Sequence, residues 1–206
     1  MASIEVEIRG KIEDFDKVLG EFRKKAKFIR EKKRISFIYF RNEVVKDVKE
    51  IKEEKVDLRA RITDRKAELI MKYGDWGGSD SRREISLPIE IENFEEAIDF
   101  LRFLGWDRGV VIPTETFVFD YEGVEFALVK NSHFKYFEAE EIVDNQKKVE
   151  SVNKHLLTIC REFNLKPFKE EEFIHQINTL NNIKENQFDF SKQSFSLFRK
   201  MFKEYF

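Results

Sequence analysis

The sequence predicts an α+β protein in which a closed or nearly closed β-barrel has a charged interior and is flanked by helices. First, five short segments alternate apolar and charged residues with the period of two that is typical of strands. Second, their charged faces carry both signs, and one enclosed interior explains this better than five separate solvated edges. Third, other segments have apolar residues at helical spacing. The five strand segments are residues 4–11, 57–62, 67–72, 82–87 and 136–140.

The first strand segment places two carboxylates beside two cations. Because successive strand side chains point to opposite faces, Glu5, Glu7, Arg9 and Lys11 share one face, and the apolar residues share the other. On a solvated face this is an ordinary charged edge strand. On a face that lines a cavity, the carboxylates are hard oxygen ligands for a divalent cation, and the cations suit phosphate.

The other four segments repeat this pattern. Their charged faces carry Arg59 and Arg61; Glu68 and Lys72; Arg82, Glu84 and Ser86; and Glu138 and Glu140. No single pattern is specific. Together they indicate a shared charged interior, because interior and exterior positions alternate along every strand of a barrel.

Several segments have the spacing of amphipathic helices. Asp14 suits the N-cap of the first, and Asn93 and Gly105 suit the two ends of the second. Residues 146–163 and 170–180 predict two more. The apolar stripes comprise Phe15, Val18, Leu19 and Phe22, with Phe28 and Ile29 as an optional continuation; Phe94, Ala97, Ile98, Leu101 and Leu104; and Val149, Val152, Leu156, Ile159 and Cys160.

Further strands and connections follow from composition. Residues 35–41 are rich in aromatic and branched side chains and predict a strand. Residues 110–121 and 124–130 predict two strands joined by a tight Glu-Gly turn. The glycine-rich residues 74–81 predict a loop, and the charged residues 42–55 predict a loop or a short exposed helix.

The composition narrows the classes of function. Because 38 basic residues nearly balance 40 acidic ones, no global field attracts nucleic acid or an anionic membrane. The single cysteine, Cys160, excludes an internal disulfide, and three scattered histidines argue against a zinc site. No long apolar run or leader is evident, which predicts a soluble cytoplasmic protein.

The ordered set of charged motifs resembles the CYTH domain of the triphosphate tunnel metalloenzymes. The motifs are Glu5-x-Glu7-x-Arg9, Leu58-Arg59-x-Arg61, the strand ending at Lys72, Arg82-x-Glu84 and Glu138-x-Glu140. This family includes class IV adenylyl cyclases, thiamine triphosphatases and inorganic tripolyphosphatases. The resemblance implies a closed antiparallel barrel of eight strands, with basic residues that bind a triphosphate and acidic residues that bind divalent metal.

The resemblance also implies roles for individual residues. Glu84, or one of the metal-binding carboxylates, would be the catalytic base, and the cofactor would be Mg²⁺ or Mn²⁺. The substrate-binding set would be Arg9, Lys11, Arg59, Arg61, Lys72 and Arg82, and the metal ligands would be Glu5, Glu7, Glu138 and Glu140. The expected reaction is metal-dependent hydrolysis of tripolyphosphate, thiamine triphosphate or a nucleoside triphosphate.

Four departures from the family pattern keep two alternatives open. Where the family has Lys-x-Arg, this chain has Thr114-Glu115-Thr116, and Arg9 replaces the usual lysine. Ser86 stands in place of a glutamate, and Leu128 or Val129 stands in place of an acidic residue. These losses favour, as the first alternative, a domain that binds a phosphorylated ligand without turnover. The second alternative is a class IV adenylyl cyclase.

Residues 1–182 are predicted to form the barrel domain, and residues 183–206 a separate tail. Phenylalanines from Ser194 onward recur at helical spacing, so the tail predicts an amphipathic helix that packs on the barrel or on a partner. The expected partner is a small molecule that contains a triphosphate. A homodimer through the aromatic tail is an open alternative.

Overall fold

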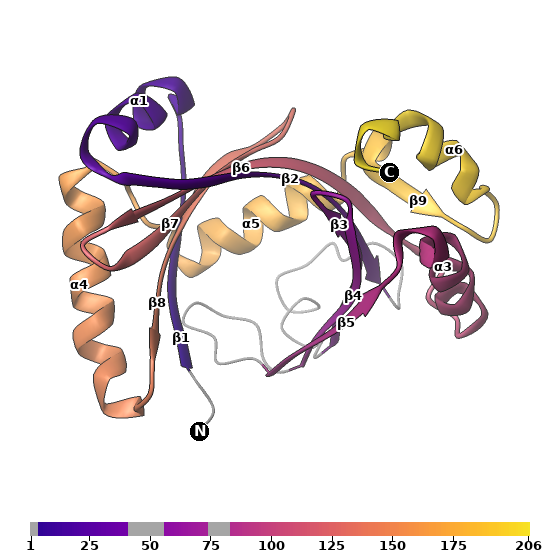
Figure 1. Cartoon of the computed structure of the whole chain (residues 1–206), viewed down its shortest axis with the longest axis horizontal. Helices are drawn as coiled ribbons and strands as arrows, with labels where there is room; N and C mark the ends of the chain where they lie inside the picture. The colour runs from indigo at the N-terminus through magenta and orange to yellow at the C-terminus, as the bar shows by residue number, and fades with distance from the viewer. Residues whose placement is uncertain (1–3, 41–55, 74–82) are drawn as a thin grey trace. The chain divides into compact units, whose positions relative to one another are not determined.

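The computed structural model describes residues 4–40, 56–73 and 83–206, with the side chains of residues 4, 5 and 83 left out (Figure 1). The strands are β1 (Ile4–Lys11), β2 (Lys27–Phe40), β3 (Val56–Thr63), β4 (Lys66–Tyr73), β5 (Arg83–Ile89), β6 (Arg108–Tyr121), β7 (Val124–Lys130), β8 (Lys135–Val143) and β9 (Gln187–Asp189). The α-helices are α1 (Phe15–Lys25), α3 (Phe94–Phe103), α4 (Val149–Glu162), α5 (Glu170–Asn181) and α6 (Phe195–Met201). Short 3₁₀ turns cover Ile91–Asn93, Gln146–Lys148, Lys184–Asn186 and Lys203–Tyr205.

The strands form one antiparallel sheet in the order β1-β8-β7-β6-β2-β3-β4-β5, and β9 pairs with β6. The α+β class predicted from the sequence is therefore confirmed. Within the described ranges, this hydrogen-bonded path has two ends, β1 and β5, and no ladder joins them. The closed eight-stranded barrel is thus not confirmed and stays a prediction.

The described residues divide into two compact units. Unit 1 contains residues 4–32 and 115–173, and unit 2 contains residues 33–40, 56–73, 83–114 and 174–206. The long strands β2 and β6 each contribute residues to both units. The predicted boundary between residues 182 and 183 stays a prediction, and both sides of it contribute to unit 2.

In unit 1, α1 and α4 cover the apolar face of the strands. Val6 and Ile8 of β1 alternate with charged residues and enter a core that includes Phe22 of α1 and Leu156 of α4. The ring of Phe22 stacks on Phe163 with centroids 3.9 Å apart. These contacts remove the apolar faces of α1 and α4 from water, and such burial is the main source of stability for amphipathic helices.

In unit 2, α3 and the C-terminal segment cover the apolar face of β2 to β4. Phe37 of β2 has ring contacts with Phe94 of α3 and with four phenylalanines of the C-terminal segment. Those four are Phe188, Phe190, Phe195 and Phe198. The aromatic side chains of the tail are therefore mostly core residues of unit 2, and α6 begins right after Ser194, whose side chain caps it.

One expectation from the sequence changes. Phe28 and Ile29 do not continue the first helix: α1 ends at Lys25, and both residues lie in β2 with exposed side chains. The pattern was misleading because two apolar residues fit either period, and pairing within the sheet selects the strand. The predicted loop at 74–81 and the charged segment at 42–55 lie outside the described residues.

None of the described helices combines the length and apolar character needed to cross a membrane.

Candidate functional site

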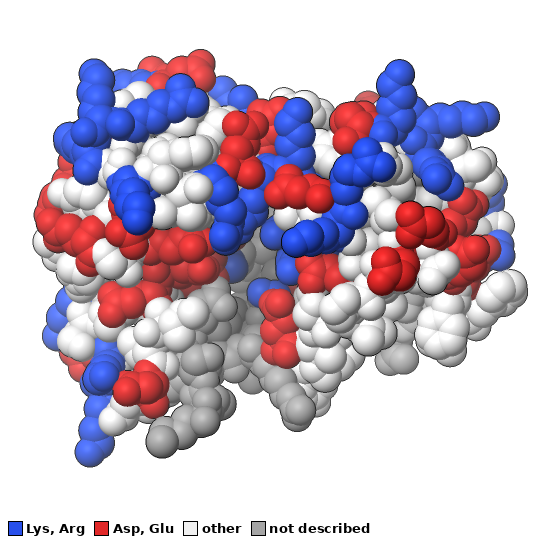
Figure 2. All heavy atoms as spheres, in the orientation of Figure 1, with Lys and Arg blue, Asp and Glu red and all other residues white. Residues whose placement is uncertain are grey.

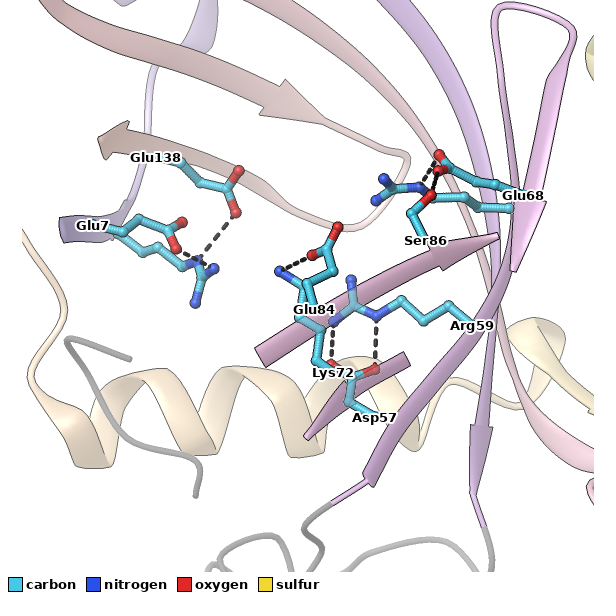
Figure 3. A network of polar contacts seen from close by, with 10 residues as sticks. Glu7, Asp57, Arg59, Glu68, Lys72, Glu84, Ser86 and Glu138 are labelled. Atoms are coloured by element: carbon cyan, nitrogen blue, oxygen red, sulfur yellow. Dashed lines mark hydrogen bonds and ion pairs between the residues drawn. The ribbon is translucent and has the colours of Figure 1, made fainter. Parts of the chain in front are cut away.

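Arg9 lies between two carboxylates in unit 1. The antiparallel register of β1 and β8 sets Arg9 opposite Glu138 and Glu7 opposite Glu140. Arg9 Nε donates to Glu138 Oε1 at 3.1 Å, and Arg9 Nη2 donates to Glu7 Oε2 at 2.5 Å (Figure 3). Burial by itself lowers the pKa of Arg9, but the charges of Glu138 and Glu7 outweigh it and raise that pKa above its usual value. Arg9 is therefore permanently cationic.

The register also aligns four carboxylates across four neighbouring strands. Glu7 of β1 lies opposite Glu140 of β8, which lies opposite Glu125 of β7, which lies opposite Asp120 of β6. We call Asp120, Glu125, Glu140 and Glu7 the acidic row. The sequence analysis missed Asp120 and Glu125, although counting outward from the predicted Glu-Gly turn pairs them. Like charges directly opposite each other repel, so the row favours a nearby cation.

Among the described side chains of unit 1, the carboxylates are not arranged to hold a resident divalent metal. Two of the four predicted ligands, Glu7 and Glu138, are bonded to Arg9, and the side chain of Glu5 lies outside the description. No group of three or more His, Cys, Asp or Glu side chains among the described residues is placed to hold a metal ion. A divalent ion about 4 Å from a guanidinium would be repelled by about 8 kcal/mol at an effective dielectric of 20.

In unit 2, strands β3 to β5 carry a second charged face, which we call the cationic face: Arg59, Arg61 and Lys72. Each of its cations has a carboxylate partner (Figure 3). Arg59 donates through Nε and Nη2 to Asp57 at 2.7 and 2.6 Å, Arg61 Nε donates to Glu68 at 2.6 Å, and Lys72 Nζ lies 2.9 Å from Glu84.

The register of unit 2 explains the pairs of Arg61 and Lys72, whereas Arg59 bonds Asp57 two residues before it on the same strand. Arg61 lies opposite Glu68, and Lys72 lies opposite Asp57 on one side and Glu84 on the other. The sequence prediction that Arg59 and Arg61 share a face with Glu68, Lys72, Glu84 and Ser86 is consistent with this register. Asp57 was not predicted as a site residue. Its side chain is only 1% exposed, so Arg59 is held by a buried carboxylate.

The remaining predicted residues are placed as follows. Lys11 is exposed at the end of β1, opposite Tyr136. Arg82 lies outside the described residues. Thr116 is buried opposite Val129 on the face of the acidic row, whereas Leu128 packs in the core of unit 1. Val129, and not Leu128, therefore lies on the charged face.

Glu68, the partner of Arg61, has a pKa that its surroundings shift. Burial by itself raises its pKa, but hydrogen bonds from Arg61 and Ser86 outweigh burial and hold the pKa of Glu68 below its ordinary value of 4.5. A lowered pKa in the folded state means that the folded state favours the ionised group. Its contribution to stability is complete above the ordinary value and is lost as the pH falls through the lowered one.

We expect Glu68→Gln to lower the free energy of unfolding at neutral pH and to have a smaller effect at acidic pH. The difference from wild type should shrink as the pH falls below 4.5, because the wild-type carboxylate then loses its charge. Urea unfolding at a series of pH values measures this. Glu150→Gln is the control, since its exposed pair with Lys154 on α4 contributes little at any pH. A Glu68 effect that does not depend on pH would contradict the prediction.

Both signs of charge occur across the face of the molecule drawn in Figure 2, in keeping with a net charge of −2. A site for a polyanion must therefore be local, and the cationic face brings three cations together, each beside a carboxylate that orients it. Arginine offers paired N–H donors that match phosphate oxygens, and lysine offers a point charge. The arrangement is chemically suited to a phosphorylated ligand.

Comparison with solved structures places the fold. No protein-family model matches the sequence, and no curated protein matches it. The PH1819 protein of Pyrococcus horikoshii has a TM-score of 0.64 at 20% identity, covering 84% of this chain and 99% of that chain. A Vibrio parahaemolyticus protein provisionally named an adenylate cyclase has a TM-score of 0.62 at 14% identity, covering 85% of this chain and 99% of that chain. The Hippeastrum protein HpAC1 has a TM-score of 0.53 at 12% identity, covering 85% of this chain and 96% of that chain. The chain therefore shares the fold of these three solved structures, two of which are named for adenylyl cyclase or triphosphatase activity.

Proposed function

We propose that the cationic face of β3 to β5 binds the triphosphate group of a small molecule and that the protein hydrolyses a phosphoanhydride bond of that ligand. The observation that carries the proposal is the alignment of Arg59, Arg61 and Lys72 on one face, each oriented by a carboxylate. The fold adds support, since a dominant triphosphatase activity is stated for HpAC1. The proposal needs only this face and not a closed barrel.

The three ion pairs fix the cations before a ligand arrives. A triphosphate is strongly solvated, so a site must replace its hydration with oriented donors. Asp57 uses one edge of the Arg59 guanidinium, which leaves the positive charge in place and the direction of the side chain set. Such positioning lowers the entropic cost of binding.

Hydrolysis requires a water that attacks the terminal phosphorus while the bond to the bridging oxygen breaks. The proton of that water needs an acceptor, and Glu84 is the candidate base that the sequence predicts. Glu84 lies beside Lys72 at 2.9 Å, and its side chain is 39% exposed, so water reaches it. The products are orthophosphate and the shortened phosphate chain.

Mg²⁺ or Mn²⁺, which the sequence predicts, would enter such a reaction bound to the phosphate oxygens of the ligand. A metal bound in this way neutralises charge on the ligand and polarises the bond that breaks. It does not require the carboxylates of unit 1 as resident ligands. Activity with Mg²⁺, with Mn²⁺ and with a chelator tests this dependence.

We expect Arg61→Met to weaken tripolyphosphate binding by about 10- to 100-fold, because a hydrogen bond to a charged group contributes about 1.5–3 kcal/mol. Calorimetric titration measures the affinity. The matched control is Arg108→Met, which removes an arginine of β6 that lies beside Asp107 and Asp189 and outside the cationic face. Equal losses in the two variants would contradict the assignment of the site.

Turnover is tested by phosphate release from tripolyphosphate, thiamine triphosphate and ATP, beside an assay for cyclic AMP. Release that depends on Arg61 and Glu84 supports the hydrolase. The second candidate, a domain that binds without turnover, is favoured by the lack of a metal-ligand cluster among the described side chains. It replaces the hydrolase if wild type is inert while tripolyphosphate still raises its melting temperature. Cyclic AMP formation would indicate the cyclase.

A further inference from the structure

We propose that the guanidinium of Arg9 takes the place of a divalent cation between Glu7 of β1 and Glu138 of β8, so that these two carboxylates hold no resident Mg²⁺ or Mn²⁺. The motivating geometry is the bridge that Arg9 makes between Glu7 and Glu138, at 2.5 and 3.1 Å. The bridge involves residues of unit 1 alone, so its role can be tested independently of triphosphate hydrolysis.

The local structure holds Arg9 in this position from several sides. The guanidinium lies over the ring of Phe173, 5.5 Å from its centroid, and the Arg9 carbonyl accepts a hydrogen bond from the Phe168 N–H at 2.8 Å. The next residue, Gly10, lies against the Lys166 carbonyl and the buried Phe137 ring. With its backbone fixed and its side chain packed, Arg9 remains between the two carboxylates.

The choice of arginine matters to this inference. A guanidinium is planar, always charged, and presents several N–H donors in a fixed geometry, so one arginine can bond two carboxylates on different strands. A lysine at this position would offer a compact charge on a flexible stem. It would leave one carboxylate without a fixed bond and available to a metal ion.

The neighbouring acidic row explains why a cation is needed here. Glu7 belongs to the row, and Glu140 lies directly opposite it. Stacking carboxylates on adjacent strands is unfavourable without a compensating positive charge. Arg9 supplies that charge within the chain, and the same charge repels a divalent ion from Glu7 and Glu138.

The test measures Mn²⁺ uptake by the full chain with electron paramagnetic resonance, in wild type, Arg9→Lys and Arg9→Met. We expect weak uptake by wild type and an affinity at least about tenfold higher in both variants, because lysine leaves one carboxylate without a fixed bond and methionine removes the repelling cation. Arg108→Lys is the matched control and should behave as wild type, since it alters an arginine beside two carboxylates in unit 2.

Arg9→Met removes the cation that bonds both Glu7 and Glu138, so its folding is followed by thermal unfolding with and without Mn²⁺. We expect its melting temperature to rise with Mn²⁺, whereas that of wild type stays unchanged. Arg9→Met combined with Glu7→Gln and Glu138→Gln should fold without Mn²⁺ and lose the response to it. Equal Mn²⁺ uptake by wild type and both single variants would overturn the inference, as would a wild-type site that Glu7→Gln and Glu138→Gln abolish.

Discussion

Replacing Arg59 by methionine is expected to lower the free energy of unfolding by about 3–5 kcal/mol. Its partner Asp57 has a side chain that is 1% exposed and accepts two hydrogen bonds from the guanidinium. Removing one member of a buried ion pair leaves the other charge buried with fewer compensating contacts, which is strongly destabilising. Because small proteins are stable by only about 5–15 kcal/mol, this loss is a large part of the total. Urea unfolding followed by circular dichroism measures it.

Arg61→Met is the matched comparison on the same strand and face. Its partner Glu68 is 22% exposed and also accepts a hydrogen bond from Ser86, so we expect a smaller loss of about 1 kcal/mol. The double variant Asp57→Val with Arg59→Met should recover most of the stability, since an apolar pair removes the buried charge. It should not recover tripolyphosphate binding. An Arg59→Met protein as stable as Arg61→Met would contradict the role given to Asp57.

Gly10→Ala is expected to lower the free energy of unfolding by about 3 kcal/mol. An added Cβ would overlap the Lys166 carbonyl oxygen and the Phe137 ring. The first is backbone and the second is fully buried, so neither can move aside without disturbing the core. Moving β1 would also draw Arg9 away from Glu138. Chemical denaturation measures the stability, and Mn²⁺ uptake reports the state of the Arg9 bridge.

Gly20→Ala is the control for this prediction. Gly20 lies inside α1, and an added Cβ there would meet nothing within 4 Å. Alanine is favoured over glycine in a helix interior, so we expect a gain of about 0.5–1 kcal/mol. Opposite signs for the two glycines would show that space, and not the loss of glycine itself, decides the effect. Losses of unfolding free energy of similar size in both variants would contradict that explanation.

The sequence by itself determined which residues share a face. Strand side chains alternate with a period of two, so Arg59 and Arg61, or Glu7 and Arg9, had to lie together once the strands were identified. Helical spacing likewise identified the apolar stripes of α1, α3 and α4, because a 3.6-residue period is a local property of the chain. These local rules were sufficient for the fold class and for most of the candidate charged residues.

Only the tertiary structure decided which strand lies beside which, and in what register. The pairing of β1 with β8 sets Arg9 opposite Glu138, so two carboxylates expected to bind metal form ion pairs with a guanidinium. Register between distant strands depends on packing and loop geometry, and a shift by one residue would reverse every face. For the same reason the full acidic row, from Glu7 and Glu140 to Glu125 and Asp120, became evident only when the strands were assembled.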